Sequence, residues 1–111
     1  MQITISDDTS PTAKVALVGQ LDIAGAEVVA LPLATLAGAK TNIIVDMSGV
    51  SFVSSIGIRQ LVLASKAISR RGGKLVLVNP TDMVRDVFVI SDLSDLLPMV
   101  ATESEAYALL G

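Results

Sequence analysis

The residues of this chain best suited to chemistry are two adjacent serines, Ser54 and Ser55, at the predicted start of an amphipathic helix. A hydroxyl in that position lies beside free backbone N–H groups and the positive end of the helix dipole, which favour added negative charge. Ser55 is therefore a candidate for phosphorylation. Alternatively, one of the two serines is only an N-cap that satisfies an unpaired N–H group. Both interpretations can hold, because one serine can cap the helix while its neighbour is modified.

Several classes of chemistry are excluded by composition. The 111 residues include no cysteine and no histidine, which rules out disulfides, thiol catalysis and a Ser-His-Asp triad. We expect no metal site, no cofactor and no catalysis by the chain itself. A net charge of −3 and only three aromatic residues argue against binding of nucleic acid. No apolar stretch is long enough to insert into a membrane, and no signal peptide is visible, so we expect a cytoplasmic protein.

The elements that must position Ser55 form a single predicted α/β domain over residues 1–111. The predicted order is ββαβαβαβα, with a mixed, mostly parallel sheet covered by about four helices. The predicted strands are 2–6, 15–19, 42–45, 74–78 and 97–100, and the predicted helices are 23–36, 55–71, a segment carrying Met83, Val87 and Ile90, and 102–110.

Three positions in this scheme carry specific predictions. Asp22 is placed to cap the first helix. Pro32 should bend or interrupt that helix, because proline cannot donate to the Val28 carbonyl. Asp46 should end the central strand and order the following polar loop, residues 48–54, through hydrogen bonds from backbone N–H groups to its carboxylate.

The helix after Ser55 has two apolar stripes. The first has helical spacing and should face the sheet; it comprises Ile58, Leu61, Val62, Ser65 and Ile68. The second comprises Ile56, Leu63 and Ala67, and it runs beside Arg59, Lys66 and Arg70. The second stripe is either buried under neighbouring helices or exposed as a docking surface for a partner protein.

Three segments of the chain resemble a known family. Residues 19–22 (GQLD) resemble the G-E-L-D box of STAS-domain anti-sigma factor antagonists, and residues 46–58 (DMSGVSFVSSIGI) resemble their D-L-S-x-V-x-F-M-D-S-S-G-L signature. Residues 72–78 (GGKLVLV) match the segment that follows the same helix. The resemblance implies that an ATP-binding serine kinase, which doubles as an anti-sigma factor, phosphorylates Ser55, and that a PP2C-type phosphatase reverses this.

The chain departs from the family signature at two positions. Ser54 replaces the aspartate that usually precedes the acceptor, and Ile56 replaces the serine or threonine that usually follows it. The first change removes a negative charge beside the acceptor, and the second adds an apolar side chain.

The leading interpretation is a protein-binding module that docks on its kinase while Ser55 is unmodified. The expected contact residues are Asp22, Ser54, Ile56, Gly57, Arg59 and Leu63. One alternative keeps the fold and makes the chain an accessory subunit of a lipid-transport ATPase or a scaffold in a stress-sensing complex. A remote alternative is an aspartate phosphotransfer receiver, in which Asp7, Asp8 and Asp46 bind Mg²⁺.

Overall fold

The central sheet determines where each helix begins. The structure, a computed structural model, describes residues 1–6 and 10–110 of the chain. Within these residues five strands form one sheet in sequence order, with β1 antiparallel to β2 and the other neighbours parallel. The strands are β1 (Gln2–Ser6), β2 (Thr12–Leu21), β3 (Asn42–Val53), β4 (Leu75–Val78) and β5 (Met99–Val100).

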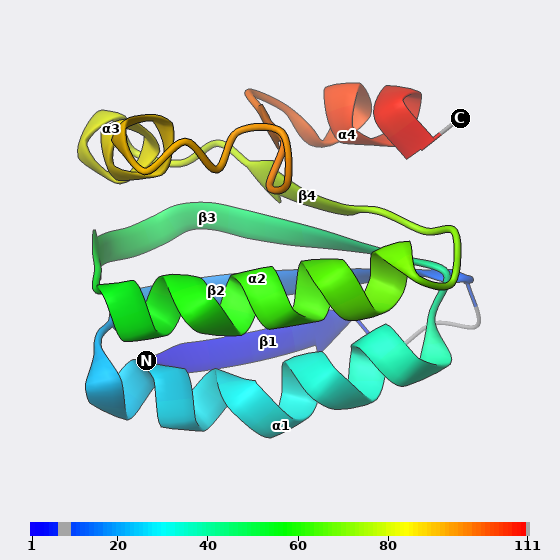
Figure 1. Ribbon diagram of the computed structural model, residues 1–111, viewed down its shortest axis with the longest axis horizontal. Coiled ribbons are helices and arrows are strands. Elements are labelled where there is room, and N and C mark those ends of the chain that lie inside the picture. The colour runs from blue at the N-terminus through cyan, green and yellow to red at the C-terminus, as the bar shows by residue number, and fades with distance from the viewer. Residues whose placement is uncertain (7–9, 111) are drawn as a thin grey trace.

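Four helices in the described part of the chain alternate with the strands after β2. They are α1 (Ile23–Ala39), α2 (Ser55–Ser69), α3 (Asp82–Ile90) and α4 (Glu103–Leu110). This order confirms the predicted ββαβαβαβα arrangement and the α/β class. Figure 1 shows α1 and α2 lying side by side along the sheet, with α3 and α4 near β4.

Alternate residues of the strands contribute to two separate cores, because successive side chains of a strand point to opposite faces. In the larger core, Val45 of β3 packs with Val29 of α1 and Leu61 of α2. In the smaller core, Ile44 of β3 packs with Ala106 of α4. Helices α1 and α2 therefore share one face of the sheet, and α4 covers part of the other.

The predicted core stripe of α2 is confirmed. Four of its members are buried, namely Ile58, Leu61, Ser65 and Ile68. Val62 is half-buried and packs against the same core. The one polar member, Ser65, donates a hydrogen bond from its hydroxyl to the Leu96 carbonyl at 2.8 Å. This buried hydroxyl therefore has a hydrogen-bond partner.

The central strand is longer than predicted. It continues through Val53, so both the predicted strand end at Val45 and the polar loop beyond it are wrong. The pairing of β3 with β2 contains two register shifts, and such β-bulges disrupt the alternation of polar and apolar residues by which a strand is recognised. Buried Val50 and Val53 hold the extended part of β3 in the sheet.

Asp46 lies inside β3, at the first of these register shifts. Its Oδ1 atom accepts a hydrogen bond from the Ser48 backbone N–H at 2.9 Å. The predicted bond between the carboxylate and the backbone is therefore confirmed, but the prediction that Asp46 ends the strand is wrong. The carboxylate instead satisfies an N–H group within the bulge.

Pro32 does not interrupt α1, which is a single helix from Ile23 to Ala39 (Figure 1). The predicted interruption is therefore wrong, whereas the alternative, a bend at Pro32, stays a prediction. A proline inside a helix removes one hydrogen bond, and burial of Val29 and Leu33 on either side of it holds the two halves of α1 against the sheet.

Two glycines allow α1 and α2 to begin directly against the end of β2. A Cβ atom on Gly25 would overlap the Gln20 carbonyl oxygen, and one on Gly57 would overlap the Leu21 carbonyl oxygen. Both overlaps are with backbone atoms, which cannot move without shifting the strand. Only glycine at these two positions allows each helix to lie this close to the strand.

We expect Asp46→Ala to lower the free energy of unfolding by about 1–2 kcal/mol, because the Ser48 N–H loses its charged acceptor. Urea denaturation measures this change. Ser48→Ala is the matched control, since it keeps the backbone N–H and should leave the midpoint nearly unchanged. An Asp46→Ala midpoint equal to that of the wild type would contradict the assigned role.

Gly57→Ala should lower the free energy of unfolding by about 1–3 kcal/mol, because the new methyl group displaces the start of α2 from β2. Gly38→Ala is the control within a helix: no atom lies within 4 Å of its added Cβ, and alanine favours helix. Thermal unfolding of both variants should show a loss for Gly57→Ala only. Equal melting temperatures for the two variants would show that the close approach does not constrain the fold.

Candidate functional site

The helices α1 and α2 begin at neighbouring points on one edge of the sheet. Leu21 ends β2, Val53 ends β3, and these two residues are paired in the parallel ladder. The next residue in each chain segment, Asp22 or Ser54, is the N-cap of the following helix. Two sets of free N–H groups and two positive dipole ends are thus brought together.

Asp22 caps α1 as predicted. Its Oδ1 atom accepts a hydrogen bond from the Gly25 N–H at 2.8 Å. The carboxylate therefore satisfies the first turn of α1, and as a half-buried group beside the start of α2 it also contributes negative charge to the site.

Ser54 caps α2 and ties it to β2. Its hydroxyl oxygen accepts from the Gly57 N–H at 3.2 Å, and the hydroxyl donates to the Leu21 carbonyl at 3.1 Å. The Ser54 N–H donates to the same carbonyl at 3.0 Å. Of the two serines, Ser54 therefore has the structural role of an N-cap.

Ser55 is the first residue of α2, and its side chain is exposed. Among the described residues its hydroxyl has no hydrogen-bond partner. The first turn of α2 contains no acidic residue that would repel added negative charge. An accessible hydroxyl at a positive helix end is the geometry that accepts a phosphate without distorting the helix.

Three exposed apolar side chains flank these helix starts, and we call them the apolar rim. Ile23 is 66% exposed, Phe52 is 46% exposed and Ile56 is 42% exposed. Sequence reasoning identified Ile56 and missed the other two. A predicted strand that continued to Val53 would have placed Phe52, next to the inward-facing Val53, on the side away from the core. Ile23 could have been found because it directly follows the N-cap Asp22.

The remaining candidate residues differ in their exposure. Arg59 and Leu63 are exposed on the outer side of α2, where Leu63 is 49% accessible to solvent. Gly57 is buried against Leu21, so it supports the start of the helix and offers no surface to a partner. Ala67, the third member of the second apolar stripe, is half-buried and packs against the core.

The described residues form no metal site. In the described ranges, no group of three acidic, histidine or cysteine side chains is arranged to hold a metal. Asp7 and Asp8, which the receiver alternative requires, lie outside those ranges. A groove of about 390 Å³ lies over the sheet beside α4, lined by Lys14, Asp46 and Glu103 among others, and Ser55 is not part of it. No described helix is long and apolar enough to span a membrane.

Comparisons with known proteins identify the family of this chain. The family model for the STAS domain matches residues 2–106. An anti-sigma F factor antagonist of Lysinibacillus sphaericus is 31% identical over 100 residues, which cover 88% of this chain and 85% of that protein.

Two solved structures of SpoIIAA have the same fold. The anti-sigma factor antagonist SpoIIAA in its unphosphorylated form has a TM-score of 0.81 and 29% identity, over 96% of this chain and 93% of that one. SpoIIAA of Bacillus in the phosphorylated form has a TM-score of 0.75 and 28% identity, over 99% and 100% of the two chains. The chain therefore belongs to the STAS domain family, in the group of anti-sigma factor antagonists.

Proposed function

We propose that this chain is a partner-switching protein controlled by phosphorylation of Ser55. The unmodified chain docks on an ATP-binding serine kinase that is also an anti-sigma factor, and this docking frees the sigma factor. The kinase transfers phosphate to the Ser55 hydroxyl, which releases the chain. A PP2C-type phosphatase removes the phosphate and restores binding. The chain is a substrate and a binding partner in the cytoplasm, and it catalyses no reaction.

The observation that carries this proposal is the difference between the two serines. Ser54 uses its hydroxyl to cap α2 and to hold Leu21, whereas the Ser55 hydroxyl faces solvent one residue further on. A kinase can reach Ser55 without disturbing the N-cap. SpoIIAA, a relative with the same fold, has been solved in both an unphosphorylated and a phosphorylated form, which supports modification of this chain.

The surroundings of Ser55 explain how phosphate prevents docking. A phosphate adds about −1.5 to −2 charges, and it lies beside the apolar rim formed by Ile23, Phe52 and Ile56. A partner that covers this rim has to bury the new charge or leave the rim exposed. A loss of about 1–3 kcal/mol weakens binding roughly 5- to 150-fold, which is enough to release a partner.

The two departures from the family signature are compatible with this mechanism. Ser54 caps α2 through its hydroxyl, as the usual aspartate can through its carboxylate, and it removes one negative charge from beside the phosphate. Ile56 enlarges the apolar rim, so a larger part of the binding energy comes from apolar burial close to the acceptor.

Ser55→Ala should bind the kinase with wild-type affinity and accept no phosphate. Ser54→Ala should still be phosphorylated at Ser55 but unfold at lower urea concentration, because losing the N-cap costs about 1 kcal/mol. Incubation with the host's kinase and ATP, followed by peptide mass spectrometry, locates the phosphate. Phosphate on Ser54, or undiminished incorporation in Ser55→Ala, would overturn the assignment.

Ile56→Asp should weaken kinase binding about tenfold or more, because it places a charge in the apolar rim, next to Ser55 in the sequence. The fold should persist, since the side chain is 42% exposed. Tyr107→Asp is the control: Tyr107 is 44% exposed on α4, away from the rim, and its substitution should leave affinity unchanged. Calorimetry measures binding and circular dichroism measures folding. Equal affinities of the two variants for the kinase would show that the apolar rim is not part of the interface.

A further inference from the structure

The two edges of the sheet differ in length. Strand β5, at one edge, has only two residues, Met99 and Val100. Strand β1, at the other edge, has five residues, and all five pair with β2 in a regular antiparallel register. None of the described strands pairs with the outer side of β1. That side therefore presents a row of backbone N–H and C=O groups that a further strand can bind.

Strand β1 lacks the features by which proteins usually protect such an edge. Its sequence, QITIS, contains no charged residue and no proline, and its register with β2 contains no bulge. Lysine, proline and bulges are the common means of preventing an edge strand from pairing with another chain. The isoleucines and the threonine of β1 also favour strand, because they are β-branched. The outer edge of β1 is therefore suited to the addition of a strand.

The two faces of β1 carry different side chains. The register joins Ile3 to Leu17 and Ile5 to Val15. Leu17 and Val15 are buried in the larger core, so both isoleucines lie on the side of the sheet that α1 covers. Ile3 packs against that core, whereas Ile5 is 39% exposed. Thr4 is exposed and lines the groove on the opposite face.

We propose that β1 pairs with β1 of a second copy of the chain, in an antiparallel arrangement about a two-fold axis at Thr4. The strand is self-complementary about this residue. Thr4 lies opposite Thr4 of the other copy, and Ile3 lies opposite Ile5. Opposite residues of an antiparallel pair share a face, so Ile3 of one copy covers the exposed Ile5 of the other, and the two threonines pair on the polar face.

This register also satisfies the backbone of the edge. In an antiparallel pair, alternate residues direct their N–H and C=O groups toward the neighbouring strand. Whichever alternate residues of β1 point outward, pairing centred on Thr4 forms roughly four to six backbone hydrogen bonds between the copies.

The proposed assembly is a closed dimer. Each copy contributes the same edge, so the interface is isologous and the two sheets join into one. The edges that remain are the two short β5 strands, which offer little backbone for further pairing. One short strand pair is a small interface of the weak, transient class, so we expect a monomer–dimer equilibrium. An extended segment of another protein would satisfy the same backbone groups, but only a second copy is certain to place Ile3 opposite Ile5.

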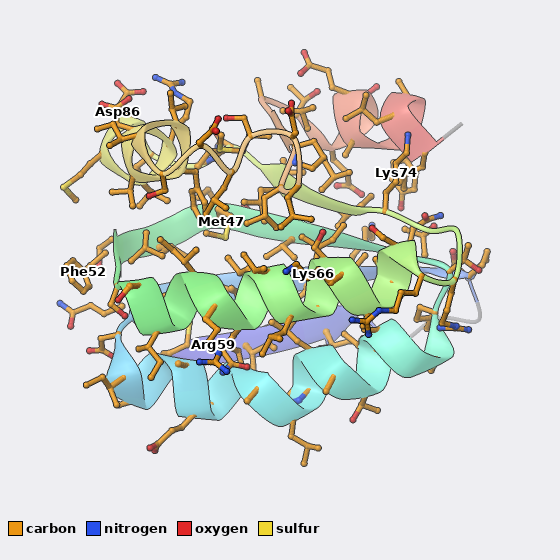
Figure 2. The ribbon with its side chains drawn as sticks, in the orientation of Figure 1. Met47, Phe52, Arg59, Lys66, Lys74 and Asp86 are labelled. Carbon is orange, nitrogen blue, oxygen red and sulfur yellow. The ribbon has the colours of Figure 1, made fainter. Side chains whose placement is uncertain are left out.

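Sedimentation equilibrium of the chain from micromolar to millimolar concentration should show monomers and dimers. Thr4→Lys should weaken dimerisation at least about tenfold, because two lysines would lie directly opposite each other. Thr4→Val should dimerise at least as well as the wild type, since valine keeps the β-branched pair. Asp86→Asn is the matched control, because it raises the net charge by one, as Thr4→Lys does. Figure 2 shows Asp86 on α3, on the far side of the molecule from β1.

A single cysteine tests the register of the pairing. The chain contains no cysteine, so Thr4→Cys places one thiol in each copy. Opposite Cα atoms of an antiparallel pair lie about 4.5–5.5 Å apart, which is within the range that a disulfide spans. Oxidised glutathione should therefore link Thr4→Cys into a dimer with native circular dichroism, and should link Asp86→Cys at least about tenfold more slowly.

Four results would overturn the proposal. They are a chain that stays monomeric at millimolar concentration, equal dimerisation of the wild type and a folded Thr4→Lys, equal cross-linking of the two cysteine variants, and species larger than a dimer. Circular dichroism separates loss of the interface from loss of the fold, and if Thr4→Lys unfolds, the wild type and Thr4→Cys decide the question. Phosphorylation of Ser55 in Thr4→Val reports on the kinase site alone, so the proposed function can fail or hold independently.

Discussion

The parallel pairing of Leu21 with Val53 is the constraint on which the site depends. It brings the ends of β2 and β3 together, and the residues that follow are both helix N-caps. The Leu21 carbonyl then accepts two hydrogen bonds from Ser54, one from its N–H and one from its hydroxyl. Because the start of α2 is bonded to the end of β2, the position of Ser55 is fixed by the sheet and not by a flexible loop.

Because α2 is attached to the sheet in this way, the residues that hold the fold together differ from the residues that a partner can contact. The groups that hold α2 in place already have their partners: the half-buried Ser54 caps the helix, and the buried Gly57 donates its N–H to Ser54. Groups available to a partner, such as Ser55 and Ile56, are exposed and make no contribution to the larger core. A charge added at Ser55 therefore acts on the surface seen by a partner, while the dipole of α2 stabilises the charge locally.

The sequence was sufficient for the features that depend on local pattern. Helical spacing predicted the buried face of α2, and cap chemistry predicted Asp22 at the start of α1. The full length of β3 could not be predicted, because two bulges disturb its alternation and the polar segment after Asp46 looks like a loop. The continuity of α1 through Pro32 was missed for a different reason: tertiary burial of Val29 and Leu33 compensates for the lost hydrogen bond.

The apolar rim also could not be predicted in full from local sequence pattern. Ile56 was identified because it belongs to the second apolar stripe of the predicted helix and departs from the family signature, whereas Ile23 and Phe52 became visible only when the two helix starts were placed together. Each of them is an ordinary apolar residue in its own segment. Their exposure results from the pairing of β2 with β3, which is a long-range property of the fold.

The most direct test of this account is a comparison of the unmodified chain with a chain that carries phosphoserine at position 55, introduced during translation. Calorimetry gives the affinity of each form for the kinase, and amide chemical shifts show which residues the phosphate affects. The account predicts an affinity lower by roughly 5- to 150-fold, with shift changes confined to the starts of α1 and α2. Unchanged affinity, or shift changes that extend to buried core residues such as Phe88, would contradict it.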